Sequence, residues 1–256
     1  KKVFLIILIS SFFLLLKNFS AQEKNTIMIF APASLKDSLT EVIEEYKSEK
    51  KINIREVYLG TAQLAQQIKN GAEPDIFISA NIEWMQHLEE RDLVLHDYRY
   101  TLLSNSLVAI TGAENFKLKK KKYFSNIKKT FLNTKTRISL AMVNAVPAGI
   151  YAREFFENIG IWKSIKSNVA NSPNVRAALS FVSRGDLEYG VVYKSDAVAD
   201  KRVKVIYNLD PNLYTKVQYP ITVLNEKKYT IRIYDFLKGK KAAQIFKKWG
   251  FIVKSD

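Results

Sequence analysis

Four helix starts in this sequence follow predicted strands and carry small residues instead of charged ones. They lie at Ser34 in "APASLKD", Thr61 in "YLGTAQLAQQI", Ala148 in "VPAGIY" and Ser172-Pro173 in "NSPNVRAAL", with Val175 in the first turn of the last. A helix N-terminus presents unpaired backbone N–H groups and about half a positive charge. Several such ends that converge on one point form an anion-binding site without charged side chains. Tyr193 in "VVYKSDA" ends another predicted strand and can add a hydroxyl donor.

Ordinary capping residues open three of these helices: Ser34 with Asp37 three residues later, Asn144 with Pro147, and Ser172 with Pro173. Taken alone, each start is more typical of a capped helix with no ligand, and Tyr193 is more typical of a tyrosine at the edge of a core. The prediction of an anion site therefore depends on the whole set and on its position after strands, where open parallel sheets bind ligands.

Strand and helix patterns alternate along the chain, which predicts two α/β units with parallel sheets covered on both faces. The predicted strands are 26–31, 52–59, 75–80, 106–111, 137–142, 189–193, 203–207 and the extended segment 216–224. The predicted helices are 34–50, 61–71, 82–90, 148–158, 173–184, 230–237 and 241–249. Because no flexible linker separates the units, we expect crossing strands near 103–107 and 216–221 to join them.

Residues 1–21 are typical of a cleaved signal peptide rather than of a membrane anchor. Two lysines precede an apolar run of 14 residues, Val3–Leu16, which is short for a membrane span, and cleavage is expected after Ala21. The chain has no cysteine, which excludes disulfides, zinc–thiolate sites and a lipoprotein anchor. We expect a free, soluble periplasmic protein.

The formal net charge of the chain is +15, of which three positive charges lie in residues 1–21, so the remainder carries +12. Most lysines are dispersed, and the dense run Lys119–Lys122 lies in a polar segment typical of a solvated loop. This pattern favours a long-range attraction for small anions over a nucleic-acid partner.

Several motifs together resemble, in order and spacing, the periplasmic molybdate-binding proteins of ABC transporters: "IFAPASLKDSL", "QLAQQIKNGAEPDIFISA", "VPAGIYA", "NVRAALSFV", "YGVVYKSDAVA" and "DFLKGKKAAQIFKKWGF". The resemblance covers about Thr26 to Phe251. It implies a type II periplasmic-binding-protein fold of the α/β class: two doubly wound sheets joined by crossing strands, with the ligand in the cleft between two lobes. The expected lobes are 22–104 plus 217–256, and 105–216.

The resemblance also implies a binding protein, without catalytic residues or cofactor, that captures molybdate or tungstate and delivers it to a membrane permease. A monomer is expected. The family's ligands correspond here to the hydroxyl and N–H of Ser34 and Thr61, the N–H of Ala148 and Val175, and the hydroxyl of Tyr193. This sequence departs from the family pattern at three positions: Thr61 replaces the usual serine, Ala62 a frequent second serine, and Pro32 removes an N–H near Ser34.

The same residues also permit other functions to different degrees. A binding protein for another tetrahedral oxyanion, such as sulfate, fits the pattern, because only cavity size separates sulfate from molybdate. A secreted hydrolase fits less well, since His87 and His96 adjoin no candidate nucleophile and no catalytic motif is present. The spacing of Asp75, His87 and Asp196 does not suggest a metal cluster; Asp75 is expected to be structural and Asp196 to cap a helix.

Overall fold

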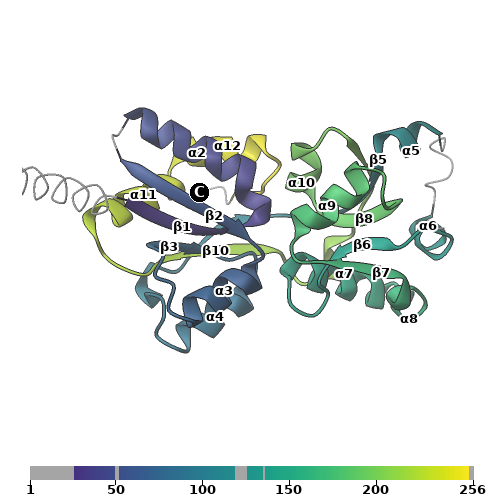
Figure 1. Ribbon diagram of the computed structural model, residues 1–256, viewed down its shortest axis with the longest axis horizontal. Coiled ribbons are helices and arrows are strands. Elements are labelled where there is room, and N and C mark those ends of the chain that lie inside the picture. Colours follow the sequence, from purple (N-terminus) through teal and green to yellow (C-terminus); the bar gives the residue numbers. More distant parts are fainter. Residues whose placement is uncertain (1–25, 50–51, 119–125, 135, 254–256) are drawn as a thin grey trace, which may run out of the picture.

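The computed structural model describes residues 26–49, 52–118, 126–134 and 136–253. The predicted signal peptide, its cleavage site and the lysine run 119–122 lie outside these residues. The described chain forms two α/β lobes side by side along the long axis of the molecule (Figure 1). No helix within the described ranges combines the length and apolar character needed to cross a membrane.

The first lobe is built on a five-stranded sheet of order β2-β1-β3-β10-β4. Its strands are β1 (Thr26–Pro32), β2 (Asn53–Leu59), β3 (Ile76–Ile78), β4 (Tyr100–Ser104) and β10 (Gln218–Val223). Its helices are α2 (Lys36–Glu49), α3 (Thr61–Lys69), α4 (Ile82–Glu89), α11 (Lys228–Lys238) and α12 (Lys240–Lys248). β1 pairs in parallel with β2 and β3, whereas β10 runs antiparallel to both of its neighbours.

The second lobe repeats this plan with the order β7-β6-β8-β5-β9. Its strands are β5 (Leu107–Gly112), β6 (Ile138–Ala141), β7 (Val169–Ser172), β8 (Tyr189–Tyr193) and β9 (Val203–Asn208). Its helices are α5 (Ala113–Leu118), α6 (Ile127–Leu132), α7 (Pro147–Asn158), α8 (Trp162–Ile165), α9 (Val175–Ser183) and α10 (Lys194–Ala199). β6 is parallel to β7 and β8, and β5 is antiparallel to β8 and β9.

Apolar faces at helical spacing explain why the helices lie on the sheets. In α2, the predicted face of Leu39, Val42, Ile43 and Tyr46 is fully buried or nearly so, and burying each aliphatic side chain stabilises the fold by roughly 1.5–3 kcal/mol. Helices α2, α11 and α12 cover one face of the first sheet, and α3 and α4 cover the other (Figure 1). The expected two-lobe fold with sheets covered on both faces is therefore confirmed. The prediction of parallel sheets is wrong, because β10 in the first sheet and β5 in the second run antiparallel to their neighbours, so both sheets are mixed.

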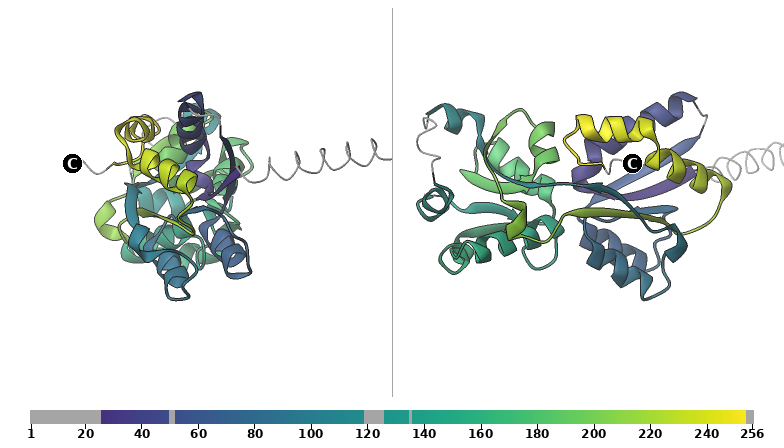
Figure 2. Two further views of the ribbon diagram at one scale, coloured as in Figure 1. Left: turned by 90° about the vertical axis from the view of Figure 1, so that its left-hand side faces the viewer. Right: turned by 180° about the vertical axis from the view of Figure 1, so that it is seen from behind.

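The chain passes between the lobes twice, between β4 and β5 and between β9 and β10, and Figure 2 shows these two segments side by side from behind. The chain therefore passes from one sheet to the other near the two positions predicted from the sequence. We propose lobe boundaries at 104/105 and 216/217, because every strand of the first sheet then falls in the first lobe.

The two lobes place corresponding helices at corresponding strand ends. In each sheet the strand next to the edge, β1 or β6, leads into the first helix, α2 or α7, and the edge strand, β2 or β7, leads into the next, α3 or α9. Because the carboxyl ends of these strands in both lobes face the cleft, four helix N-termini point toward the space between the lobes.

Candidate functional site

A small pocket lies where these helix starts from the two lobes meet. Its empty volume is about 220 Å³, so the space suits a small ion and not a large organic ligand. All five residues predicted as ligands line it. The lining consists of Pro32, Ala33, Ser34, Leu59, Gly60, Thr61, Ala80, Val146, Pro147, Ala148, Asn174, Val175 and Tyr193.

Ser34 lies in the 3-10 turn Ala33–Leu35 that precedes α2, and its side chain is buried. The predicted capping box of Ser34 and Asp37 is wrong, because no side chain caps this turn. The Ser34 hydroxyl instead lies 2.9 Å from the hydroxyl of Tyr219, on β10. Asn105 Nδ2 donates to that Tyr219 oxygen at 3.5 Å. With the Tyr219 proton directed at the Ser34 oxygen, the Ser34 proton remains free for a ligand.

Thr61 is the first helical residue of α3, after Gly60 as N-cap. Its hydroxyl oxygen accepts a hydrogen bond from the backbone N–H of Ala80 at 3.1 Å. A hydroxyl that accepts in this way still has its own proton to donate. Ala62, the position at which the family often has a second serine, is buried and offers no donor from its side chain.

Ala148 lies in the first turn of α7, one residue after Pro147. The predicted cap, Asn144, does not cap: Val146 occupies that position, and Asn144 accepts instead from Arg153 at 2.9 Å. A Cβ at Gly149 would collide with the backbone carbonyls of β6 and the loop after it. The small residues of this turn therefore let the helix end approach the sheet closely. Pro147 has no N–H and the N–H of Gly149 donates to the carbonyl of Val146 at 2.9 Å, so the N–H of Ala148 is the one left for a ligand in this turn.

Val175 is the first residue of α9, and the predicted cap at this start is also wrong. Asn174, not Ser172, is the N-cap, and its side chain accepts from the N–H of Ala177 at 2.9 Å. Ser172 ends β7, and its buried hydroxyl has no partner within the described chain. Because Asn174 satisfies the third N–H of the helix, the N–H of Val175 remains open to the pocket.

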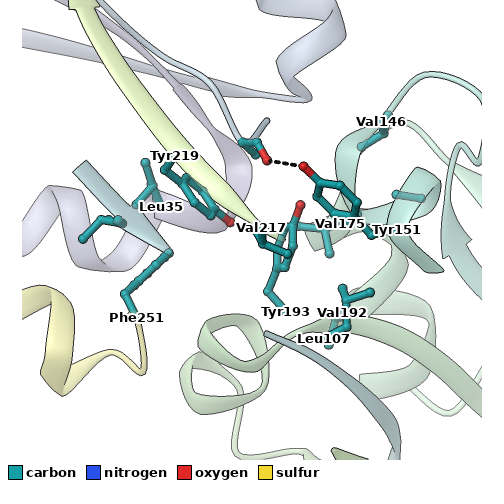
Figure 3. Packing of buried hydrophobic residues seen from close by; sticks show 14 of the residues in the cluster. Leu35, Leu107, Val146, Tyr151, Val175, Val192, Tyr193, Val217, Tyr219 and Phe251 are labelled. Atoms are coloured by element: carbon teal, nitrogen blue, oxygen red, sulfur yellow. Dashed lines mark hydrogen bonds between the residues drawn. The ribbon is translucent and has the colours of Figure 1, made fainter. Parts of the chain in front are cut away.

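Tyr193 ends β8, as predicted, and is almost completely buried, at 1% exposure. Its hydroxyl makes no hydrogen bond of good geometry with any described residue, and Figure 3 shows it pointing into the space between Val175, Tyr151 and Tyr219. Burial raises its pKa well above the ordinary value, and the neighbouring Tyr219 contributes. The hydroxyl therefore stays protonated and can act as a donor.

The set of donors defines what the pocket can bind. Hydroxyls and first-turn N–H groups surround it, and apart from the tyrosine no lining side chain is ionisable. Such a lining neutralises an anion by dipoles and hydrogen bonds. With no carboxylate among the lining residues to accept a proton, the pocket favours an anion that carries none.

The structure also reveals contacts between the lobes that the sequence did not indicate. Trp84 Nε1 donates to the carbonyl of Ala145 at 3.0 Å, and the Tyr151 hydroxyl donates to the carbonyl of Ala80 at 3.5 Å (Figure 3). Arg176 forms an ion pair across the junction with Asp37 at 2.6 Å. These contacts join residues more than 70 positions apart in most cases, so no local sequence pattern could have predicted them.

Asp75, Asp196 and His96, which are candidates for other chemistry, have structural partners. Asp75 accepts from the backbone N–H of Met28 at 2.8 Å, and Asp196 accepts from the N–H of Tyr193 at 3.2 Å as the predicted cap. His96 Nε2 lies 2.9 Å from the carbonyl of Glu89, and desolvation lowers the pKa of His87. Within the described ranges, no group of three His, Asp or Glu side chains could hold a metal ion.

The fold and the pocket are those of a solute-binding protein, and the comparisons agree. Residues 27–252 match the family model described as bacterial extracellular solute-binding protein, and the chain belongs to that family. Among relatives, the molybdate-binding protein ModA of Escherichia coli (strain K12) is 36% identical over 91% of both chains. The chain therefore belongs, more narrowly, to the family of molybdate-binding ModA proteins.

Two further matches support this placement. The molybdate-binding protein ModA of Haemophilus influenzae is 30% identical over 93% of both chains. A solved structure, the substrate binding domain of a putative molybdenum ABC transporter from Clostridium difficile, has 29% identity and a TM-score of 0.67, covering 90% of this chain and 99% of that one. Both sequence and fold thus match along nearly the whole described chain.

Proposed function

We propose that this protein is an extracytoplasmic solute-binding protein that captures one molybdate or tungstate ion between its lobes and delivers it to the permease of an ABC transporter. One observation carries the proposal: five residues from four helix starts and one strand end, far apart in sequence, line a single small pocket rich in donors. The names of the two ModA relatives, and of the molybdenum transporter domain, support the choice of ion.

In this proposal each lobe supplies part of the ligand set. Ser34 and Thr61 bind the ion from the first lobe, and Ala148, Val175 and Tyr193 bind it from the second. An ion held from both sides stabilises the closed arrangement over the open one, because only the closed arrangement offers every donor at once. A permease that recognises the closed arrangement would then distinguish loaded from empty protein.

The remaining parts of the proposal concern location and assembly. Cleavage after Ala21 would release residues 22–256 as a free periplasmic monomer without a lipid anchor. The extracellular character of the matched family supports the location, and the absence of cysteine supports the lack of a lipid anchor.

Calorimetric titration of residues 22–256 with molybdate, tungstate, sulfate and phosphate tests the proposal. We expect one ion per chain for molybdate and tungstate, together with a rise in melting temperature, since ligand at 1,000 times its Kd stabilises by about 4 kcal/mol. Binding of sulfate without binding of molybdate or tungstate would overturn the choice of ion. Binding of none of the four would overturn the proposed function.

A further inference from the structure

Arg176 follows the predicted ligand Val175 and spans the junction between the lobes. It lies on α9 of the second lobe, and its Nη1 is 2.6 Å from Oδ2 of Asp37, on α2 of the first lobe. Its Nη2 also lies 3.5 Å from the backbone carbonyl of Ser34. One side chain of the second lobe therefore contacts two residues of the first lobe, beside the pocket.

The guanidinium is held in place by its own lobe. Nε donates to Oδ1 of Asp196 at 2.6 Å, and the other oxygen of that carboxylate accepts from the N–H of Tyr193 at 3.2 Å. Asp196 is completely buried, so its position is set by the packing of α10 and β8. This contact lies within one lobe and does not depend on the position of the other. Arg176 is thus oriented toward the first lobe in advance, which reduces the entropy lost when the lobes meet.

These contacts argue against a direct role of Arg176 in holding the anion. Each of its three guanidinium nitrogens faces a protein oxygen, from Asp196, Asp37 or Ser34. Arg176 is also not among the residues that line the pocket. Its charge is directed at carboxylates, so the pocket itself remains lined by neutral donors.

Among the two carboxylates that contact Arg176, that of Asp37 is the one whose contact depends on the relative position of the lobes. Asp37 lies in the first turn of α2 with its side chain 36% exposed, whereas the Arg176 side chain is 21% exposed. Separation of the lobes would return this carboxylate to water and break the pair, but would leave the Arg176–Asp196 pair intact. The Arg176–Asp37 contact therefore favours the closed form selectively.

We propose that Arg176 and Asp37 form an interlobe latch that stabilises the closed form and slows the release of the bound ion. The latch rests on the proposed function, and both residues are positioning residues that do not touch the ion. Stabilising the closed form raises the affinity for every ion that fits by the same factor, because the apparent Kd varies inversely with the closed population. The latch therefore affects how long an ion stays bound, and it does not change which ion is preferred.

The test compares wild type with Asp37→Asn and Asp37→Glu by stopped-flow tryptophan fluorescence with sodium molybdate and sodium tungstate, and by calorimetry. Trp84 lies at the lobe junction and contributes to the signal. We expect Asp37→Asn to release both ions roughly five- to tenfold faster, with little change in association rate. Asp37→Glu, which keeps the charge, should recover most of the slow release.

Glu157→Gln is the matched control, since the Glu157 carboxylate is about as exposed as that of Asp37 but its pair with Arg153 lies within α7. It should release both ions at the wild-type rate. If Asp37→Asn also releases ions at the wild-type rate, or if only the melting temperature of the ion-free protein falls, the latch is refuted while the proposed function stands. A wild type that binds neither ion refutes the proposed function, and the latch with it.

Discussion

Tyr193 combines two properties that rarely occur together. Its hydroxyl is buried, yet it has no hydrogen-bond partner among the described residues. An unsatisfied buried polar group costs about 1–3 kcal/mol. A bound anion would accept a hydrogen bond from the Tyr193 hydroxyl and remove this cost. The cost in the empty protein therefore favours the ion-bound form.

Substitution Tyr193→Phe tests this preference. It keeps the ring and its packing against Tyr219 but removes the hydroxyl, so the ion-free protein should melt unchanged or slightly higher. A hydrogen bond to a charged acceptor contributes roughly 1.5–3 kcal/mol, which corresponds to a ten- to hundredfold loss of molybdate affinity. Titration and melting of both proteins separate the outcomes. Wild-type affinity combined with a lower melting temperature would make Tyr193 an ordinary core residue.

The raised pKa of Tyr193 leads to a prediction about alkaline pH. Its hydroxyl ionises at higher pH in the folded protein than in the unfolded chain, whose tyrosines have a pKa of about 10. Below about pH 10 this group is protonated in both states, and it changes neither stability nor binding. Above that, the unfolded chain ionises first, and stability falls. We expect molybdate affinity measured by calorimetry to be constant from pH 7 to about 9.5; a decline with a midpoint below pH 9 would contradict a protonated Tyr193 donor.

Local sequence patterns predicted which residues line the pocket but not all of their partners. The helix starts at Ser34, Thr61, Ala148 and Val175 and the strand end at Tyr193 do line one pocket, and their role as ion ligands stays a prediction. The expected cap at Ser34 failed because Tyr219, 185 positions away, takes its hydroxyl. Asp37 failed as a capping partner because Arg176, on the other lobe, takes its carboxylate. In both cases a residue distant in sequence takes the place of the expected local partner. Local patterns in a single sequence do not show which distant residues will be in contact.

At the scale of elements, long periodic segments were predicted well, and several short elements were missed. The apolar face of α9, with Ala178, Leu179 and Val182 buried, follows directly from its spacing. The short elements β7 (Val169–Ser172) and α8 (Trp162–Ile165) went unpredicted, because four residues are too few to show a period. The prediction of the site residues does not depend on these two elements, because most of the helix starts at the site belong to long elements.

The loop between β2 and α3 makes a close approach to the other lobe. A Cβ built on Gly60 would lie 2.6 Å from the backbone carbonyl of Pro173, in the second lobe. The backbone of Gly60 has φ −66° and ψ 140°, which any residue can adopt. Glycine is therefore needed here for contact between lobes and not for local conformation.

Gly60→Ala should consequently affect closure without unfolding the first lobe. The ion-free protein should melt at or slightly above the wild-type temperature, since alanine restricts the unfolded chain. Molybdate affinity should fall about tenfold or more, because the added methyl group holds the lobes apart and the ion loses donors from one side. Calorimetry and thermal melting measure the two quantities. An alanine variant with wild-type affinity would show that the lobes do not need this close approach.

At the scale of the whole molecule, two copies of one sheet plan bring helix starts to a common pocket. β1 and β2 end beside Ser34 and Thr61, and β6 and β7 end beside Ala148 and Val175, so each lobe contributes the same pair of positions. The sequence showed no repeat, yet the strand order is equivalent in both lobes. Alternating strand and helix patterns predicted two α/β lobes joined by crossing strands, whereas the antiparallel strands in each sheet and the contacts across the junction depend on the packed structure.

The net charge of the whole molecule should affect the rate at which an anion associates more than the rate at which it dissociates. The chain outside residues 1–21 carries a net charge of +12, but no lysine or arginine lines the pocket. Dispersed surface charge speeds the encounter with an anion and is screened by salt, whereas buried hydrogen bonds are screened little.

From about 20 mM to about 500 mM sodium chloride, we expect the association rate for molybdate to fall roughly tenfold. The dissociation rate should change by only about twofold, mostly through the partly exposed Arg176–Asp37 pair. Stopped-flow measurements across the salt series give both rates, with sodium sulfate left out so that no second tetrahedral anion competes. If the dissociation rate instead rises steeply with salt, the ion is held by exposed cations at the surface, and the neutral pocket between the lobes is not its binding site.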